Sequence, residues 1–232
     1  MNIFYSNIIN GKTIELSQQE SHHCINVMRN NIGDMVIVLD GKGNKYTATV
    51  ASKNKTVLLN SDKKESFSSN STSIHIGISP TKSQDRMDWF IEKSVEIGID
   101  RISFIKTQRT ERDKINFNRV NRIAISAMKQ SGQYYLPTIN NLNSFDEVIN
   151  STKEEQLFIA HVEDSLNHHL AGLCSPDKSV CLLIGPEGDF TKDEISLAKA
   201  RKFKSVSLGR SILRTESAGV YSVSLIRGLN ER

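Results

Sequence analysis

The chain has 232 residues, of which 38% are hydrophobic and 24% are charged, enough to bury one substantial core or two smaller ones. Its formal net charge is +4, but the cations are unevenly spread, because residues 101–122 and 192–214 each hold seven basic and two acidic side chains. Basic surfaces of this kind favour polyanionic partners, although a merely solvated surface has the same composition.

Cellular location can be predicted from the cysteines and from the hydrophobic pattern. Cys24, Cys174 and Cys181 are odd in number and widely scattered, which predicts reduced thiols. No stretch approaches the roughly 18 apolar residues of a membrane span, and the first residues lack the pattern of a signal peptide. We therefore expect a soluble, cytoplasmic protein.

The first sixty residues predict short strands joined by tight turns, which is typical of a small β-barrel. Strands are expected over residues 35–39, where MVIVL lies between turn residues, and over residues 45–51 and 56–60. One helix, over residues 18–28, interrupts them. Residues 61–73 are almost free of apolar side chains and predict a linker.

Two domains follow from this linker, one over residues 1–70 and one over residues 74–232. Beyond the linker, strands and helices alternate, which predicts a mostly parallel sheet covered by helices. The expected strands are residues 74–78, 102–105, 157–162, 180–184 and 205–208, and the expected helices begin near Gln84, near Phe117, after Thr191 and near Ala218.

The sequence IGPEGDF follows the apolar run 180–184 and forms a sharp loop at its end. Ligands of open α/β sheets bind beyond the carboxyl ends of strands, so this loop is placed to hold one. Gly185 and Gly188 allow backbone angles and close approaches that a Cβ would forbid. Thr191 and Glu194 predict a capping box that fixes the start of the next helix. An ordinary strand-to-helix turn is the alternative interpretation.

A second glycine loop, RSILRTESAG, follows the strand that ends at Leu208 and Gly209. Two such loops side by side would form two walls of one pocket. Neither contains G-x-G-x-x-G or a GK[ST] phosphate cradle, which argues against dinucleotide and triphosphate ligands. The carboxylates of Glu187 and Glu216 fit a cationic or neutral nucleoside better.

Four motifs in order, SHHCINVMRNNIGDMVIVLDGKGNKY, TKSQDRMDWFIEKSVEIGID, IGPEGDF and SLGRSILRTESA, resemble the bacterial 16S ribosomal RNA uridine N3-methyltransferases of the RsmE type, in the SPOUT superfamily. The resemblance covers nearly the whole chain. It implies a PUA-like RNA-binding β-barrel, then an α/β methyltransferase domain with a deep trefoil knot. It also implies a homodimer that uses S-adenosylmethionine to methylate N3 of a uridine in 16S rRNA of the small ribosomal subunit.

The resemblance also implies roles for individual residues. In the catalytic step, Arg214 would stabilise the uridine anion, and Glu216 or an ordered water would take the N3 proton. The chain carries Asp189 where the family usually has a second glycine. The cofactor site implied by the matching positions consists of Leu183, Ile184, Gly185, Glu187, Gly188, Leu208, Gly209, Ile212, Leu213 and Thr215.

RNA contacts are expected from charge and from the same motif matches. No metal is expected, since the His22-His23 and His168-His169 pairs lack further ligands at suitable spacing. For each RNA candidate, a solvated surface side chain is the alternative interpretation. The RNA-binding candidates are His22, His23, Arg29, Lys82, Asp85, Arg86, Arg109 and Arg112.

Two other function classes remain open. One is a ribosome-assembly RNA-binding protein with an inactive methyltransferase fold, which Asp189 and Gln133 keep open because the family more often has other residues there. The other is a nucleotide-dependent oxidoreductase, against which the missing glycine fingerprint counts. Binding of S-adenosylmethionine separates the leading prediction from both.

Overall fold

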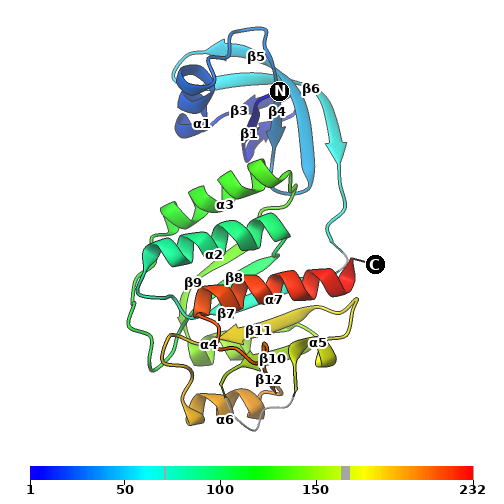
Figure 1. Ribbon diagram of the computed structural model, residues 1–232. Coiled ribbons are helices and arrows are strands. Elements are labelled where there is room, and N and C mark those ends of the chain that lie inside the picture. Colours follow the sequence, from blue (N-terminus) through cyan, green and yellow to red (C-terminus); the bar gives the residue numbers. More distant parts are fainter. Residues whose placement is uncertain (71, 163–167, 232) are drawn as a thin grey trace. The chain divides into compact units, whose positions relative to one another are not determined.

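A computed structural model describes residues 1–70, 72–162 and 168–231 (Figure 1). The chain divides into two compact units. The first comprises Met1–Ser69 with Met128–Leu136, and the second comprises Asn70–Ala127 with Pro137–Arg232. Within the described ranges, no helix has the length and apolar character needed to cross a membrane.

The first unit is built on one six-stranded sheet with the strand order β1-β4-β5-β6-β3-β2. Side chains from all six strands, with Phe4, Val38 and Leu59 among them, pack into a single core, so the sheet is curled around it. Alternate residues of each strand point inward, as a half-buried strand requires. The strands are β1 (Ile3–Tyr5), β2 (Ile8–Asn10), β3 (Thr13–Glu15), β4 (Met35–Leu39), β5 (Asn44–Lys53) and β6 (Val57–Ser66).

The predicted linker over residues 61–73 is wrong in its first half, because β6 continues to Ser66. This polar stretch is held by backbone pairing with β5, in which Asn44 lies opposite Ser66. Glu65 adds ion pairs at 3.1 Å to Lys63 and at 3.8 Å to Lys45. Both faces of this extension meet solvent, so the strand shows none of the apolar alternation that would predict it. Ser71 lies outside the described residues.

The helix expected over residues 18–28 is two shorter elements. An α-helix, α1 (Gln18–His22), is followed directly by one turn of π-helix, η1 (His23–Val27). Ser17 caps α1 by accepting a hydrogen bond from the Glu20 amide. The wider π-turn is not encoded by any local periodicity, so the sequence predicts only that the segment is helical.

Residues 128–136 belong to the first unit although they are distant from it in sequence. The Lys129 ammonium lies 2.6 Å from the Glu20 carboxylate, with both side chains largely buried. The Gly43 amide donates to the Tyr134 carbonyl at 3.0 Å, and the Tyr134 ring stacks on Phe67 with centroids 3.7 Å apart. The segment is therefore an integral part of this unit's structure.

The second unit contains a six-stranded parallel sheet with the order β12-β10-β11-β7-β8-β9. The parallel sheet covered by helices confirms the α/β prediction. Its strands are β7 (Ile74–Ile78), β8 (Arg101–Lys106), β9 (Thr138–Ser144), β10 (Gln156–Ala160), β11 (Val180–Ile184) and β12 (Lys204–Val206). Its helices are α2 (Gln84–Ile97), α3 (Phe117–Ser131, which continues into the first unit), α4 (Phe145–Ser151), α5 (Leu170–Leu173), α6 (Lys192–Ala200) and α7 (Thr215–Asn230).

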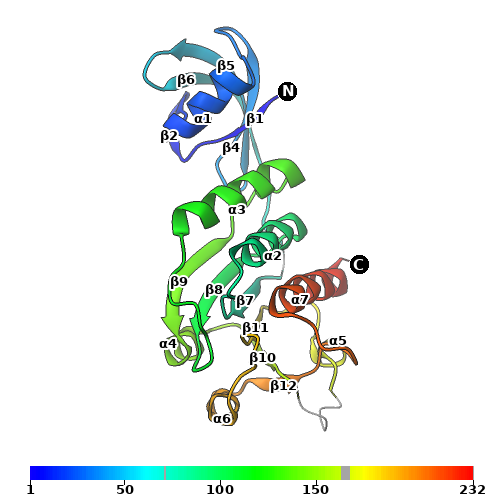
Figure 2. The ribbon, with the colours of Figure 1, turned by 60° about the vertical axis from the view of Figure 1, so that its left-hand side comes forward.

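Helices cover both faces of this sheet, which is why β7 and β11 are buried along their whole length. On one face, α4 and α6 pack against Cys181, Leu183 and neighbouring side chains. On the other face, α7 packs against α2 and β7 (Figure 2). A side chain at Gly219 of α7 would collide with the Phe90 ring of α2, so glycine permits this close approach.

Candidate cofactor pocket and its surroundings

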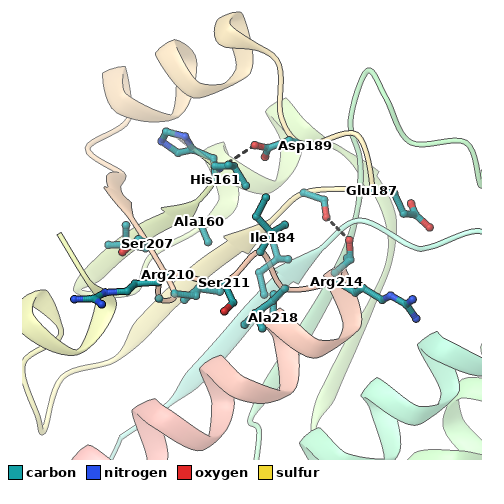
Figure 3. A pocket seen from close by; sticks show the side chains of 18 of the residues that line it. Ala160, His161, Ile184, Glu187, Asp189, Ser207, Arg210, Ser211, Arg214 and Ala218 are labelled. Carbon is teal, nitrogen blue, oxygen red and sulfur yellow. Dashed lines mark hydrogen bonds between the residues drawn. The ribbon is translucent and has the colours of Figure 1, made fainter. Parts of the chain in front are cut away.

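A cavity of about 960 Å³ opens at the carboxyl ends of three neighbouring strands, β10, β11 and β12 (Figure 3). This volume is in the range of small-molecule sites. The cavity is lined by Ala160, His161, Val162, His169, Ile184, Gly185, Pro186, Glu187, Asp189, Val206, Ser207, Leu208, Gly209, Arg210, Ser211, Ile212, Leu213, Arg214, Thr215 and Ala218.

The two glycine loops both line this cavity, but they do not follow adjacent strands. Strand β10 lies between β11 and β12 and contributes a third wall, formed by Ala160, His161 and Val162. No local pattern in the sequence predicts β10 at this place, because strand order depends on packing between distant segments. Two glycine-marked loops could be found from the sequence, whereas this third wall could not.

Hydrogen bonds from several segments hold the loop after β11. The Thr215 hydroxyl at the start of α7 donates to the Gly185 carbonyl at 3.0 Å. The Glu187 carboxylate accepts from the Lys82 amide at 3.1 Å, and the Arg109 guanidinium donates to the Gly188 carbonyl at 2.5 Å. The loop is thus fixed before any ligand arrives, which lowers the cost of binding.

Asp189 connects this loop to β10. Its backbone has φ 61°, in the left-handed region that aspartate tolerates better than most residues. One carboxylate oxygen accepts from the Phe190 amide at 2.7 Å, and the other accepts from the Val162 amide at 2.9 Å. The following helix α6 begins with the predicted capping box, in which Thr191 and Glu194 bond reciprocally.

Eight of the ten predicted cofactor residues line the cavity: Ile184, Gly185, Glu187, Leu208, Gly209, Ile212, Leu213 and Thr215. Leu183 is fully buried in the core between the sheet and α4, outside the lining. At Gly188, a side chain would meet Arg109 at 3.3 Å, so this residue lies against the segment that follows β8 and is outside the cavity lining. Lining residues that the sequence reasoning did not single out for the site include His161, His169 and Arg210.

The two predicted catalytic residues lie in different environments. Arg214 is exposed and lines the cavity (Figure 3). Glu216 is buried and outside the lining, and its carboxylate lies 3.7 Å from the Arg86 guanidinium of α2. The second carboxylate oxygen of Glu216 is buried and has no hydrogen-bond partner among the residues that the structure describes.

The predicted RNA residues are divided between the two units. His22, His23 and Arg29 lie at α1, η1 and the turn after them, where Arg29 has a left-handed φ of 55°. In the second unit, Lys82 pairs with Glu111 at 2.8 Å, and Asp85 lies 3.7 Å from Arg119. Arg112 donates to the Gln84 side chain. Several of these charges are therefore already bonded within the protein.

A buried polar cluster lies at the opposite, amino-terminal edge of the sheet. The two ring nitrogens of His75 lie 2.9 Å from Glu154 and 2.8 Å from Ser103. The Arg101 guanidinium also reaches Glu154, at 3.3 Å. His75, Glu154 and Cys181 are close enough to hold a metal ion, but both imidazole nitrogens already have protein partners. The sequence could not show this cluster, because its members come from three separate segments.

Comparison with known proteins places the chain in a family. A family model of the RNA methyltransferase domain matches residues 68–227, and a model of the RNA methyltransferase PUA domain matches residues 16–59. The chain belongs to the RNA methyltransferase family. This confirms the resemblance found in the four motifs and identifies the first unit as containing a PUA-like domain.

Individual relatives, matched over most of their length, agree with the two family models. The chain is 28% identical to ribosomal RNA small subunit methyltransferase E of Buchnera aphidicola, over 91% of this chain and 86% of the relative. A crystal structure of a probable rRNA-methyltransferase from Porphyromonas gingivalis superposes with a TM-score of 0.90 at 35% identity, covering 99% and 98% of the two chains. Another, ribosomal RNA small subunit methyltransferase E from Neisseria gonorrhoeae bound to S-adenosyl methionine, gives 0.86 at 26% identity, covering 99% and 98%.

The cavity of the methyltransferase has the chemistry that S-adenosylmethionine requires. Ile184, Leu208 and Leu213 offer apolar surface for a nucleoside and a thioether chain. Backbone groups of the two glycine loops border the cavity and can fix the polar edges of the ligand. Two carboxylates, Glu187 and Asp189, lie in the lining and favour a ligand that carries positive charge, as a sulfonium does.

Proposed function

We propose that this enzyme methylates N3 of a specific uridine in 16S rRNA of the small ribosomal subunit, with S-adenosylmethionine as the methyl donor. The observation that carries the proposal is the cavity formed by the ends of β10, β11 and β12, in a chain whose family is established. The relatives from Buchnera aphidicola and Neisseria gonorrhoeae are named as methyltransferases of small-subunit ribosomal RNA, and the latter structure holds S-adenosyl methionine.

The cofactor supplies an electrophilic methyl group on a sulfonium. The protein must hold the uracil nitrogen in line with that group and assist the loss of its proton. Positioning provides most of the acceleration, and a general base adds a factor of about 100 to 10,000. Arg214, which lines the cavity, would stabilise the negative charge on the uracil carbonyl oxygens.

Arg214 lines the cavity, but Glu216, the candidate general base, does not. Its carboxylate is outside the lining and lies beside Arg86, so an ordered water would have to carry the proton to it. A carboxylate in the first turn of α7 also stabilises that helix through its dipole. We retain Glu216 as a candidate that acts through water.

The finer architecture of the family belongs to the same proposal. We infer a trefoil knot formed by the chain end, and this inference rests on the family resemblance. We also infer a homodimer that uses α2 and α7, since Trp89 and Tyr221 on these helices are exposed aromatic residues. A monomer mass in light scattering at micromolar concentration would rule out the dimer.

The proposal divides the work between an RNA-binding domain over residues 1–70 and a cofactor-binding domain over residues 74–232. It places the enzyme in the cytoplasm, where small ribosomal subunits are made, and it requires no metal. The eight RNA-binding candidates of the sequence analysis, of which His22 is the first and Arg112 the last, would recruit the substrate to the cavity.

Replacing Ala160 with phenylalanine tests the cavity assignment, because Ala160 lines the cavity and a ring there would fill it. We expect the affinity for S-adenosylmethionine in calorimetry to fall at least about tenfold, or about 1.4 kcal/mol. Ala51→Phe on the exposed end of β5 is the matched control and should leave the affinity unchanged. Equal affinities of wild type and Ala160→Phe would refute the assignment.

Methyl transfer itself is tested by incorporation of labelled methyl groups into 16S rRNA and into assembled small subunits, followed by mapping of the modified base. We expect one 3-methyluridine per RNA. A protein that binds the cofactor but transfers no methyl group to either substrate would support the inactive assembly factor considered above.

A further inference from the structure

Two strips of the chain are rich in cations, and only one of them is used by the proposed RNA contacts. Residues 192–204 form the larger part of the second strip, which spans helix α6 and the turn into β12. This segment carries five exposed cations, namely Lys192, Lys199, Arg201, Lys202 and Lys204. Within the described part of the chain, none of these five side chains makes an ion pair or a hydrogen bond.

The first strip behaves differently. Its arginines are bonded to protein oxygens: Arg101 to Glu154, Arg119 to Asp88, and Arg109 to the carbonyl of Gly188. Arg112 and Arg122 also donate to oxygen atoms of the protein. A cation that already has a partner gives less free energy on phosphate binding, since the existing bond must be broken or shared. The second strip therefore holds more freely available positive charge.

Local structure explains some of these cations but not all five. Lys199 and Arg201 at the carboxyl end of α6 interact favourably with the helix dipole. Lys204 begins β12, an edge strand, where lysine discourages pairing with other chains. One or two charges suffice for each effect. Lys192 and Lys202 have neither explanation, and Lys192 lies in the first turn of α6, where a cation interacts unfavourably with the helix dipole.

The position of the strip connects it to the cavity. Helix α6 begins three residues after Asp189, which lines the cavity, and packs against β12 (Figures 1 and 2). Lys192, Ser196 and Lys199 are spaced by four and three residues, so they share one face of α6. Arg201, Lys202 and Lys204 continue from the end of that face into the turn. The charge thus runs from the cavity rim along α6.

We propose that the exposed face of α6 and the α6–β12 turn form a contact surface for the phosphate backbone of the RNA substrate, next to the cofactor cavity. This inference rests on the proposed function, because it assumes that RNA enters the cavity. An RNA chain whose target base enters the cavity would place neighbouring phosphates along α6. Phosphate contacts of this kind position the substrate and carry no sequence information.

The test replaces three cations together, Lys199→Gln, Arg201→Gln and Lys202→Gln. The control replaces three cations elsewhere in the same unit, Lys93→Gln, Lys153→Gln and Lys178→Gln, with the same change in net charge. Binding of a 16S rRNA transcript is measured by fluorescence anisotropy over a series of salt concentrations. Calorimetry with S-adenosylmethionine and thermal unfolding check that both variants keep the cavity and the fold.

We expect the α6 variant to lower RNA affinity about tenfold or more near physiological salt, and to make the logarithmic salt slope shallower by about 2 to 3, from about 0.7 to 0.9 per lost contact. The control should change the slope much less, and cofactor affinity should stay the same in both. If the α6 variant matches the control, the inference is wrong.

Two other outcomes are informative. If methylation of assembled subunits falls while the slope with the naked transcript is unchanged, the surface binds a ribosomal protein, and the RNA inference is overturned. If the wild-type protein neither binds nor methylates the transcript or the subunit, the proposed function fails first. The inference about α6 then fails with it.

Discussion

Asp189 stabilises the loop after β11 through hydrogen bonds of its own carboxylate. Its left-handed φ of 61° suits only a few residue types, and its carboxylate joins the Phe190 amide to the Val162 amide. A glycine would adopt the same backbone angles but would leave the Val162 amide without this acceptor. The substitution relative to the usual family pattern therefore adds a connection between β10 and the loop of β11.

Asp189→Gly should weaken S-adenosylmethionine binding about tenfold, because two hydrogen bonds worth about 1 kcal/mol each are lost from the loop. Asp189→Asn keeps an acceptor and tolerates the same φ, so its loss should be smaller. Asp177→Gly is the matched control, since Asp177 also has a left-handed φ, of 59°, but lies outside the cavity. Calorimetry measures the affinities, and an unchanged affinity in Asp189→Gly would contradict this role.

The lowered pKa of Glu154 predicts how the stability of the fold depends on pH in acid. Burial raises its pKa, but the hydrogen bond and charge of His75, with the Lys153 amide, outweigh burial and lower the pKa to about 2 from 4.5. Since the unfolded chain binds the proton more readily, the stabilisation is fully present above pH 4.5 and is lost as the pH falls towards 2.

The lowering of the Glu154 pKa from 4.5 to about 2 corresponds to about 3 kcal/mol of unfolding free energy. Glu154→Gln should therefore be less stable than wild type near neutral pH, and the gap between the two should narrow in acid. Urea unfolding of wild type and Glu154→Gln at several pH values between neutrality and pH 3 measures the two unfolding free energies and the gap between them. A gap that stays constant with pH would show that the carboxylate charge contributes little.

At the scale of elements, Arg227 holds the end of α7 against the sheet. Its buried guanidinium donates to the carbonyls of Thr72 and Gly98 and pairs with Asp100 at 3.1 Å. Asp100 also accepts from the Ile74 amide at 2.8 Å. One side chain thus joins the starts of β7 and β8, the end of α2 and the last helix.

Arg227→Met should lower the unfolding free energy by about 3 to 5 kcal/mol, because it leaves buried carbonyls and a partly buried carboxylate without their donor. Arg122→Met, an exposed arginine of α3, should change it by less than about 0.5 kcal/mol. Denaturant unfolding provides the measurement. If Asp100→Asn combined with Arg227→Met costs as much as the sum of the two single changes, the pair is not coupled.

The sequence predicted those elements whose apolar residues recur with a clear period, and missed those without one. Strand β7 has isoleucine at every second position and β11 is apolar throughout, and both have the predicted bounds. Strand β9 reads TINNLNS and only gains its strand character by pairing with β8, so no local pattern marks it. Helix α4 is only seven residues long, so its capping box and the apolar spacing of Phe145, Val148 and Ile149 cover less than two turns and give a weak local signal.

The parts of the site that lie within a short stretch of sequence could be predicted. The two glycine loops follow predicted strands, and most of their predicted residues line the cavity. Ala160, His161 and Val162 could not be found, because they join the cavity through the position of β10 between β11 and β12. Glu216 was selected for its chemistry, but α7 turns it towards Arg86, which only the packing of α7 on α2 determines.

At the scale of the whole molecule, the division into units does not follow the chain. Residues 128–136 are part of the first unit, through Lys129, Tyr134 and the Leu136 amide that donates to Gly41. A protein cut after residue 70 would therefore lose interactions on both sides of the cut. In the first fragment, Glu20 would lose its ion pair with Lys129, although its carboxylate also accepts from the Tyr5 amide, and the second fragment would expose residues that are packed in the intact chain.

A fragment of residues 74–232 tests whether the two units divide the work. The cavity is formed entirely by residues of the second unit, so we expect its S-adenosylmethionine affinity to stay within about threefold of the full chain, a change under about 0.7 kcal/mol. The exposed segment 128–136 should lower the thermal transition, because Tyr134 loses Phe67 and Lys129 loses Glu20. Removing the PUA-like domain should weaken 16S rRNA binding and give a shallower salt slope.

Because misfolding would mimic a loss of RNA binding, the comparison needs a second fragment in which Lys129 and Tyr134 are replaced by serine. Their side chains contact Glu20 and Phe67 of the first unit and lie outside the cavity lining, so the change should improve solubility without altering the cavity. A folded fragment that binds the cofactor and still binds and methylates 16S rRNA at the full rate would show that the PUA-like domain does not recruit the RNA. The cations of the second unit, including those of α6, would then carry RNA binding alone.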